Sequence, residues 1–327
     1  MRVGFLGLGS MGAAVAANLQ LSGHELRVHD VDRQTAARLV ANGASWAESA
    51  AEAAAQAEVV FTCLPGPAEV EAVALASNGL RSTMEVGSTW FDLTTNSPEV
   101  VRHLHATFGE RGVHMLDAPI SGGPQGAQSR KLAIWCGGEE AVFNRLLPVL
   151  KQIGDEPLYV GPSGSGCVAK LIHNCASFTV QSALAEAFTL GVKAGLDPLL
   201  LFRAIRQGTT GRSRTFDRLA EHFLLNDYDP PKFALQLACK DMSLALALAA
   251  SQKVAVPNAK IAMQNMQEAL RRGWGSRDAR VVMALQPERA GISVQVPRDK
   301  LRNVVDAEGV STHPPVSASS PKFEEWV

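Results

Sequence analysis

Short apolar runs alternate with stretches of helical periodicity over the first 160 or so residues. This alternation is typical of a doubly wound α/β domain, in which parallel strands are joined by crossover helices. We expect strands at Arg2 to Leu6, Glu25 to His29, Val59 to Cys63, Thr89 to Asp92, Val113 to Asp117, Leu132 to Cys136 and Leu158 to Val160. We expect helices to begin near Ser10, Arg33, Glu48, Pro67 and Pro98, and another between the last two strands.

The pattern changes to long helical periodicity after Gly161, with no proline between Ser163 and Asp197. A helix from about Gly164 to Ala194 would be roughly 45 Å long at 1.5 Å per residue. Gly195 is a suitable residue to end it. Further helices are expected at Pro198 to Gln207, Lys240 to Gln252, Asn258 to Arg272 and Ser276 to Gln286.

The chain therefore divides into three expected parts. Residues 1–162 form a Rossmann domain with a doubly wound parallel sheet, and residues 163–293 form an all-α domain for substrate and oligomerisation, led by the long helix. Residues 294–327 lose periodicity and contain His-Pro-Pro and Ser-Ala-Ser-Ser-Pro, which favour an extended or disordered tail. In the alternative, Phe323 and Trp326 dock this tail on a neighbouring subunit.

Composition indicates a soluble globular protein, since the chain of 327 residues is 46% hydrophobic and 19% charged, with a formal net charge of -1. No charge block suggests nucleic acid or an anionic membrane, and charged residues interrupt the most apolar stretches. The first strand begins at once and leaves no room for a targeting segment, so we expect a cytoplasmic enzyme. The five cysteines lack metal-ligand or disulfide spacing; we expect reduced, mostly buried thiols and no metal site.

A glycine-rich motif follows the first strand and opens the first helix. It matches G-x-G-x-x-G and consists of Gly7, Leu8, Gly9, Ser10, Met11 and Gly12. Gly7 allows the tight turn, Gly9 lets a pyrophosphate approach the backbone, and Gly12 permits close packing of helix on strand. The amides and dipole of the helix N-terminus favour the negative charge of a dinucleotide. A lone motif of this kind is often only a turn, but its context here favours a cofactor site.

Asp30 ends the second strand, about 20 residues beyond the motif. A carboxylate at that place accepts hydrogen bonds from the adenosine ribose hydroxyls and repels a 2′-phosphate. Arg33 keeps NADP open as the alternative, but Val31, not a basic residue, directly follows Asp30. We therefore expect NAD rather than NADP.

Four further segments complete the pattern. One combines Leu64-Pro65 with Asp92-Leu93-Thr94-Thr95-Asn96-Ser97-Pro98, and the others are Asp117-Ala118-Pro119-Ile120-Ser121-Gly122-Gly123, Gly161 to Asn174, and Phe233 to Asp241. Together they resemble the β-hydroxyacid dehydrogenase family, which includes 3-hydroxyisobutyrate dehydrogenase, tartronate semialdehyde reductase and 6-phosphogluconate dehydrogenase. The resemblance extends from Val3 to about Ile292.

The resemblance implies roles for particular residues. It implies that Lys170 is the catalytic lysine, that Ser121, Gly122, Gly123 and Asn174 bind the substrate, and that Leu64, Pro65, Thr95 and Lys240 contact the cofactor. Taken separately, each of these motifs has a simpler interpretation. The serine and glycines could form an ordinary surface turn, and Lys170 could be a surface lysine whose stem lies on an apolar surface. Lys240 and Asp241 could be an ordinary charge pair at the start of a helix. Lys170, His173 and Asn174 share one helical face.

Two departures from the family pattern affect the expected pocket. His173-Asn174 stands where most relatives have two asparagines, and this pair looks more like the 6-phosphogluconate branch; His173 is therefore a further candidate for substrate binding. Ser129-Arg130-Lys131 stands where relatives often have a glycine and a threonine. Arg130 either reaches an anionic substrate or is a solvated loop charge.

These expectations define one main function and two rivals. The main one is hydride transfer between NAD and the β-hydroxyl carbon of a small 3-hydroxy acid, or reduction of the matching semialdehyde, between the two domains, with Lys170 as general acid and base. The rivals are an imine-reducing enzyme, in which another residue usually replaces Lys170, and a non-catalytic dinucleotide-binding protein. The family resemblance implies a homodimer or homotetramer. The substrate is not identified by the sequence.

Overall fold

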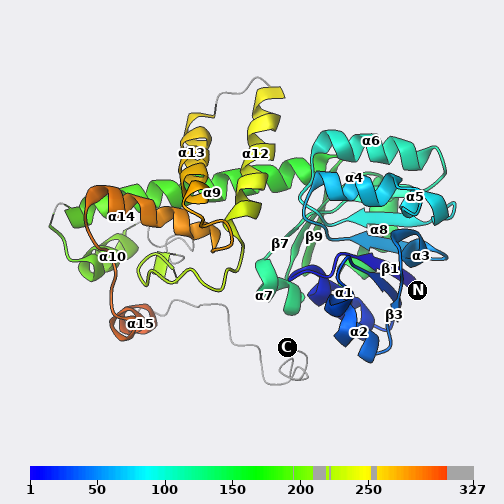
Figure 1. Cartoon of the computed structure of the whole chain (residues 1–327), viewed down its shortest axis with the longest axis horizontal. Coiled ribbons are helices and arrows are strands. Elements are labelled where there is room, and N and C mark those ends of the chain that lie inside the picture. The colour runs from blue at the N-terminus through cyan, green and yellow to red at the C-terminus, as the bar shows by residue number, and fades with distance from the viewer. Residues whose placement is uncertain (194, 209–218, 221, 252–255, 308–327) are drawn as a thin grey trace. The chain divides into compact units, whose positions relative to one another are not determined.

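The computed structural model describes residues 1–193, 195–208, 219–220, 222–251 and 256–307. The chain separates into two compact units, and the division falls between Ile172 and His173. It lies within the long helix α9 (Ser165–Lys193), some ten residues after the boundary expected from the sequence. We call the first unit the Rossmann unit and the second the helical unit (Figure 1).

The Rossmann unit is built on a nine-stranded sheet in the order β3-β2-β1-β4-β5-β6-β8-β7, with β9 paired to β8. Strands β1 to β6 are parallel, whereas β8 runs antiparallel to β6 and β7 antiparallel to β8. The expected doubly wound parallel sheet is thus confirmed, with an antiparallel region near one edge. The strands are β1 (Arg2–Leu6), β2 (Glu25–His29), β3 (Ser45–Trp46), β4 (Val59–Thr62), β5 (Thr89–Asp92), β6 (His114–Asp117), β7 (Ile120–Ser121), β8 (Ala133–Gly137) and β9 (Glu156–Gly161).

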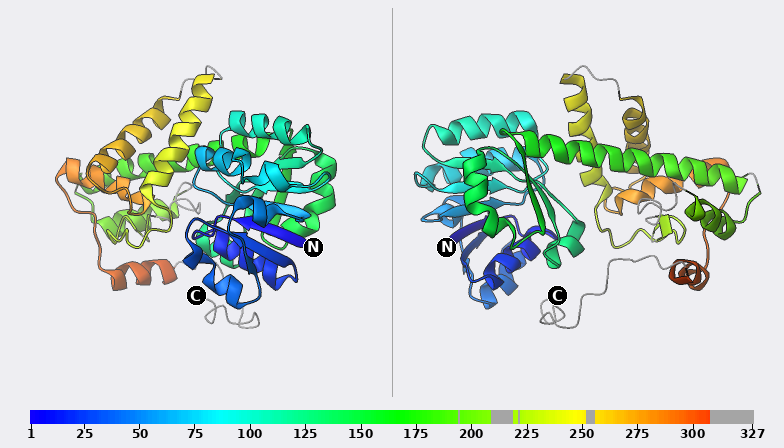
Figure 2. Two further views of the ribbon diagram at one scale, coloured as in Figure 1. Left: turned by 45° about the vertical axis from the view of Figure 1, so that its right-hand side comes forward. Right: turned by 180° about the vertical axis from the view of Figure 1, so that it is seen from behind.

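Helices cover both faces of the sheet (Figure 2). Helices α1 (Gly12–Leu21), α2 (Ala37–Ala41) and α8 (Glu140–Leu150) share a core with Phe5, Phe61 and Phe91, which stack across three neighbouring strands. On the other face Trp90 packs with α3 (Ala50–Ala54), α4 (Pro67–Leu75), α5 (Leu80–Thr83) and α6 (Pro98–Gly109). This arrangement buries both sides of the parallel strands, as their continuous apolar runs require.

The helical unit contains most of α9 together with a set of shorter helices. These are α10 (Pro198–Gln207), α12 (Leu235–Ser251), α13 (Pro257–Arg271), η2 (Ala279–Ala284), α14 (Leu285–Ala290) and α15 (Arg298–Ala307). Helices α12 and α13 lie side by side (Figure 1) and share a core that includes Met242 and Met266. No helix in the described ranges is both long and apolar enough to cross a membrane.

Several local expectations need correction. The segment expected to be a tail from residue 294 instead includes helix α15, and Val294 and Leu301 pack into the core of the helical unit. Helix α12 begins at Leu235, so Lys240 and Asp241 lie in its second turn rather than at its start. The structure also adds β3, β7, α5 and α7 (Gly123–Gln128), whereas the helix expected near Arg33 is present as η1 (Arg33–Ala36) followed by α2. Ala194, Gln252 and residues 308–327, which include Phe323 and Trp326, lie outside the described residues.

Candidate active site

The glycine turn lies where the sheet order changes direction, between β1 and β4. In an open α/β sheet this is the place where ligands bind. A Cβ on Gly12 would lie 1.9 Å from the carbonyl oxygen of Gly7, and a Cβ on Gly7 would lie 2.3 Å from that of Cys63. At Gly9 a Cβ would meet nothing within 4 Å. Glycine is thus required by the fold at Gly7 and Gly12, whereas Gly9 borders open space, which is compatible with the role that the motif predicts for it.

The remaining residues of the turn line the same region. Leu8 is buried, while Gly9 and Ser10 are exposed and Met11 is half-buried. The first helix has no side-chain cap, so a bound anion could take hydrogen bonds from its first amides. Burial and the charge of Asp92 raise the pKa of the neighbouring Cys63 thiol to about 12. Cys63 is therefore a neutral packing residue beside the turn.

Asp30 is joined directly to the glycine turn. Its Oδ2 accepts a hydrogen bond of 2.6 Å from the amide of Leu8, and its Oδ1 accepts one of 2.9 Å from the amide of Asp32. Val31 is fully exposed beside it. The Arg33 guanidinium lies over Trp46 and forms an ion pair of 3.2 Å with Glu48. These contacts fix the carboxylate next to the turn and hold Arg33 against other side chains.

Asp92 organises the loop that carries Thr95. This fully buried carboxylate accepts hydrogen bonds from the Thr62 hydroxyl, the Thr94 amide and the Asn96 side chain. Burial raises the pKa of Asp92 above its ordinary value, although these hydrogen bonds act in the opposite direction. The Thr94 hydroxyl accepts a bond of 3.0 Å from the amide of Leu64. The segments that contain Leu64-Pro65 and Thr95 are thereby held together; Leu64 and Thr95 are half-buried and Pro65 is exposed.

Ser121, Gly122 and Gly123 form the turn between β7 and α7. Ser121 is half-buried and the two glycines are exposed. Gly122 has φ of 143° and Gly123 has φ of 66°, and residues other than glycine rarely adopt these backbone conformations. A turn of this kind can present successive amides to an anion. Arg130, after α7, donates from Nε to the Asn18 side chain at 3.3 Å, so this contact ties it to α1.

Asp117 joins the end of β6 to the start of α9. Its two carboxylate oxygens accept bonds of 2.8 Å from the amides of Gly164 and Cys167. Burial raises the pKa of Asp117 above its ordinary value. A Cβ on Gly166 would lie 2.2 Å from the carbonyl oxygen of Trp135, so only glycine allows α9 to approach the sheet this closely. These contacts fix the helical turn that precedes Lys170.

Lys170, His173 and Asn174 all lie on α9, at the spacing expected. Lys170 is half-buried, His173 is exposed, and Asn174 is buried, with 7% of its surface accessible. The Asn174 side chain donates from Nδ2 to Asp241 Oδ2 at 2.5 Å. The Nδ1 atom of His173 lies 3.2 Å from Asn174 Oδ1.

Lys240 reaches the same carboxylate as Asn174. Its Nζ lies 2.7 Å from Asp241 Oδ1, and the Lys240 side chain is 27% exposed whereas that of Asp241 is 1% exposed. Two residues singled out from separate motifs are thus brought to one buried acid. Asp92, Asp117 and Asp241 were not among the predicted site residues, although each lies in one of the four segments that resemble the family.

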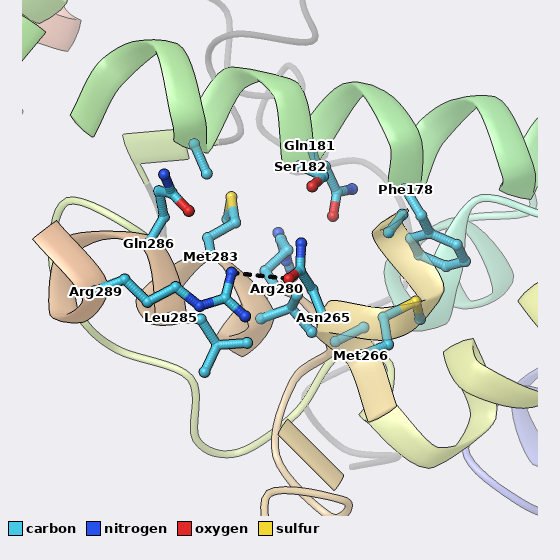
Figure 3. Close-up of a pocket in the computed structure, with 14 residues that line it drawn as sticks. Phe178, Gln181, Ser182, Asn265, Met266, Arg280, Met283, Leu285, Gln286 and Arg289 are labelled. Atoms are coloured by element: carbon cyan, nitrogen blue, oxygen red, sulfur yellow. Dashed lines mark hydrogen bonds between the residues drawn. The ribbon is translucent and has the colours of Figure 1, made fainter. Parts of the chain in front are cut away.

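A separate cavity lies within the helical unit (Figure 3). It encloses about 450 Å³, part of it open to solvent, between α9, α13, η2 and α14. None of the predicted site residues lines it. Its arginines are already engaged, since Arg280 pairs with Asp278 and Arg289 with Asn265 and Glu268. We therefore do not assign the chemistry to this cavity.

A G-x-G-x-x-G turn at the switch point of a Rossmann sheet, followed by a helical unit, is typical of NAD(P)-dependent oxidoreductases. Residues 2–162 match the model for the NAD-binding domain of 6-phosphogluconate dehydrogenase. Residues 164–285 match the model described as NAD-binding of NADP-dependent 3-hydroxyisobutyrate dehydrogenase. The chain belongs to the β-hydroxyacid dehydrogenase family, as the motifs suggested.

Named relatives agree with this assignment over most of their length. The chain is 33% identical to 2-(hydroxymethyl)glutarate dehydrogenase of Eubacterium barkeri, over 90% of this chain and 97% of the relative. It is 33% identical to NAD-dependent L-serine dehydrogenase of Pseudomonas aeruginosa, over 87% of this chain and 97% of that relative. The structure of Mycobacterium tuberculosis 3-hydroxyisobutyrate dehydrogenase with L-serine superimposes with a TM-score of 0.77 at 31% identity, covering 87% of this chain and 99% of that chain.

Two further structures concern the cofactor and the imine-reducing rival. Psf3, solved with NADP+ and 2-OPP, superimposes with a TM-score of 0.77 at 28% identity, covering 86% of this chain and 99% of that one. A reductive aminase from Aspergillus terreus superimposes with a TM-score of 0.55 at 22% identity, covering 87% and 98%, and shares the fold alone. The chain is accordingly an NAD(P)-dependent hydroxyacid dehydrogenase.

Proposed function

We propose that this enzyme oxidises a small 3-hydroxy acid at its β-hydroxyl carbon, or reduces the corresponding semialdehyde, with Lys170 as the general acid and base. The observation that carries this proposal is the pair of hydrogen bonds that the Asp117 carboxylate accepts from backbone amides at the start of α9. It couples the strand that leads to Ser121 with the helical turn that precedes Lys170. Lys170 and the turn proposed to bind the carboxylate therefore both lie within a few residues of this connection.

In the proposed reaction, Ser121, Gly122 and Gly123 hold the substrate carboxylate through the serine hydroxyl and backbone amides. The substrate hydroxyl faces Lys170, which takes its proton during oxidation and returns a proton to the carbonyl oxygen during reduction. Lys170 must be neutral when it acts as the base. The nicotinamide ring, when bound, accepts or donates the hydride. Asn174, one helical turn beyond Lys170, holds the substrate in line, and His173 extends the same polar face.

The substrates to test share a carboxylate and a hydroxyl group on the β-carbon. They include 3-hydroxyisobutyrate, L-serine, 2-(hydroxymethyl)glutarate, and glycerate with its partner tartronate semialdehyde. Support for this class comes from the relatives named as dehydrogenases of 2-(hydroxymethyl)glutarate and L-serine. A cytoplasmic homodimer or homotetramer is part of the same proposal, on the family resemblance.

We infer NAD rather than NADP as the cofactor. Asp30 lies at the end of β2 with its carboxylate tied to the Leu8 amide, where a 2′-phosphate would meet a negative charge. Arg33, the nearby cation, is engaged with Glu48 and Trp46. The residues that we propose to contact the cofactor include Leu8, Ser10 and Met11 of the glycine turn. The other proposed contacts are Leu64, Pro65, Thr95 and Lys240.

The test is a panel of these hydroxy acids and semialdehydes, assayed by NADH absorbance with NAD and NADP in parallel. Lys170→Met should lower turnover by about 10²–10⁴ while leaving NADH binding nearly intact. Lys151→Met, which changes an exposed lysine of the Rossmann unit, serves as the matched control and should retain activity. Undiminished turnover in Lys170→Met would refute the catalytic assignment. Turnover of cyclic imines alone would instead support the imine-reducing rival, and NADH binding without any turnover would support a non-catalytic protein.

A further inference from the structure

Asp241 lies at the centre of a chain of polar contacts in the helical unit. Its Oδ2 accepts a hydrogen bond from Asn174, which lies 67 residues earlier on α9, and its Oδ1 is paired with Lys240. The Asp241 side chain is only 1% exposed, and a buried charge is costly unless it is paired and hydrogen-bonded. These contacts therefore constrain the acid and both of its partners.

The carboxylate also determines the orientation of the Asn174 side chain. An ionised carboxylate only accepts hydrogen bonds, so the Asn174 atom that faces Asp241 must be the donor Nδ2. Oδ1 is then the atom that lies 3.2 Å from His173 Nδ1, and that nitrogen must carry the proton for a hydrogen bond to form. The buried acid thus fixes the donor and acceptor pattern of two neighbouring residues on α9.

We propose that Asp241 is a positioning residue for the hydroxyacid dehydrogenase reaction. It orients the Asn174 amide toward the substrate through one oxygen and holds the Lys240 ammonium through the other. This inference rests on the proposed roles of Asn174 and Lys240. It adds a residue that contacts neither substrate nor cofactor and acts only through those two side chains.

Asp241→Asn is the informative substitution, because it keeps the shape of the side chain and removes its charge. The new amide has one acceptor and one donor end, yet both neighbours, Asn174 and Lys240, present donors. Whichever way the amide turns, one of them faces a second N–H group and must move. The KM for the hydroxy acid, the Kd for NADH, or both should rise by about tenfold, the factor expected for losing one charge-assisted hydrogen bond. A change in KM identifies Asn174 as the displaced partner, and a change in Kd identifies Lys240.

Asp278→Asn is the matched control. Asp278 is also buried in the helical unit, with its side chain 1% exposed, and it also faces donors on both oxygens, from Arg280 and from the amide of Lys232. The same substitution at Asp278 should lower Tm. At an assay temperature well below Tm, it should leave KM for the hydroxy acid and Kd for NADH within about twofold of the wild-type values. If Asp241→Asn behaves in the same way, Asp241 is only structural and the inference is wrong.

Two further variants complete the test. Asn174→Ala combined with Asp241→Asn should raise KM no further than Asn174→Ala alone if Asp241 acts through Asn174; additive effects would contradict that route. Should Asp241→Asn fail to fold, Asp241→Glu keeps the charge, shifts the carboxylate by one methylene, and is judged by the same two constants. Absence of turnover by the wild-type enzyme would refute the proposed function, whereas wild-type turnover with unchanged constants in the Asp241 variants would refute this inference alone.

Discussion

The Rossmann unit and the helical unit hold their predicted site residues by different means. In the Rossmann unit, positions are set largely by the main chain: glycines without room for a Cβ, and buried carboxylates that accept backbone amides, as Asp117 does from Gly164 and Cys167. In the helical unit, Asn174 and Lys240 are held by the side chain of Asp241. Main-chain geometry sets the positions in the first unit, and a side-chain contact between helices far apart in the sequence sets those in the second.

This difference determines how substitutions should act. A change at the glycine turn alters the backbone, so it affects folding and cofactor binding together. A change at Asp241 leaves the helices intact and alters only the direction of polar groups, because helix α12 is fixed by its own apolar core. The following predictions test this contrast, from the largest expected effect to the smallest.

Gly12→Val should cause the largest loss. Its Cβ would lie 1.9 Å from the Gly7 carbonyl oxygen, so α1 must move away from β1. We expect a loss of about 4 kcal/mol or more in the free energy of unfolding, a large part of a typical domain's stability, and no measurable NADH binding. Urea unfolding and fluorescence titration with NADH measure the two effects.

Gly9→Ala is the comparison for Gly12→Val, since its Cβ would meet nothing within 4 Å. We expect near-wild-type urea unfolding and NADH binding weakened by about tenfold or more, because the methyl group occupies the space next to the pyrophosphate. Normal NADH affinity in Gly9→Ala would show that the cofactor does not approach the turn there.

The same contrast explains which parts of the molecule the sequence could predict. Strands β1, β2 and β5 were predicted to the residue, because apolar runs bounded by turn residues are local signals. Strands β3 and β7, of two residues each, are too short to have a periodicity. The link between Asn174 and Asp241 joins residues 67 apart on two helices, and no local pattern encodes it. Helix α15 was not predicted, because the prolines that follow it favour a tail even though the stretch that begins at Arg298 is amphipathic.

Asp278→Ala should cause the next largest loss and a change in acid stability. Burial acts to raise the pKa of Asp278, but hydrogen bonds and charge from Arg280 outweigh it, so the pKa lies below its ordinary value of 3.8. The ion pair therefore contributes fully above the pKa of the unfolded chain, and the contribution is lost as the pH falls through the lower, folded-state pKa.

At pH 7, Asp278→Ala should lower the free energy of unfolding by about 3 kcal/mol, since it leaves the Arg280 guanidinium without this partner in a largely buried site. The difference from wild type should shrink as the pH falls below about 3.8. Urea unfolding across this range measures it. A difference that is independent of pH would show that the pair contributes packing rather than charge.

Asp117→Ala should have a smaller effect on stability and a clear effect on turnover. It removes the acceptor of two buried amides, at a cost of about 2 kcal/mol in the free energy of unfolding. The start of α9 should then shift, and turnover should fall because Lys170 lies one to two turns further along. Asp155→Ala, at an exposed acid of the same unit, is the control. Unchanged turnover in Asp117→Ala would contradict the proposed connection between the substrate turn and the lysine.

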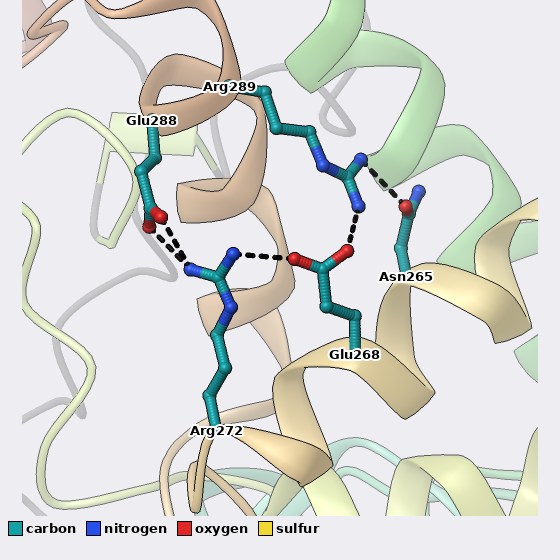
Figure 4. A network of polar contacts seen from close by, with 5 residues as sticks. All are labelled: Asn265, Glu268, Arg272, Glu288 and Arg289. Atoms are coloured by element: carbon teal, nitrogen blue, oxygen red, sulfur yellow. Dashed lines mark hydrogen bonds and ion pairs between the residues drawn. The ribbon is translucent and has the colours of Figure 1, made fainter.

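The smallest effect is expected at the polar network between α13 and α14, where Glu268 pairs with Arg272 and Arg289, and Arg272 also pairs with Glu288 (Figure 4). These pairs hold the pKa of the Glu268 carboxyl below its ordinary value, chiefly through the hydrogen bond from Arg289. Because the side chains are partly exposed and solvent screens them, Glu268→Gln should lower Tm by only about 1–3 °C.

That small shift should disappear in about 1 M salt, where the Debye length falls to roughly 3 Å. Salt weakens surface ion pairs but leaves buried ones, such as Asp278 with Arg280, largely unaffected. Thermal unfolding of both variants at low and high salt makes the comparison. If Glu268→Gln lowers Tm as much as Asp278→Ala, and equally in high salt, then the network is a structural part of the helical unit. In that case these side chains, unlike Asp241, hold the helices themselves in place by contacts that the apolar pattern does not specify.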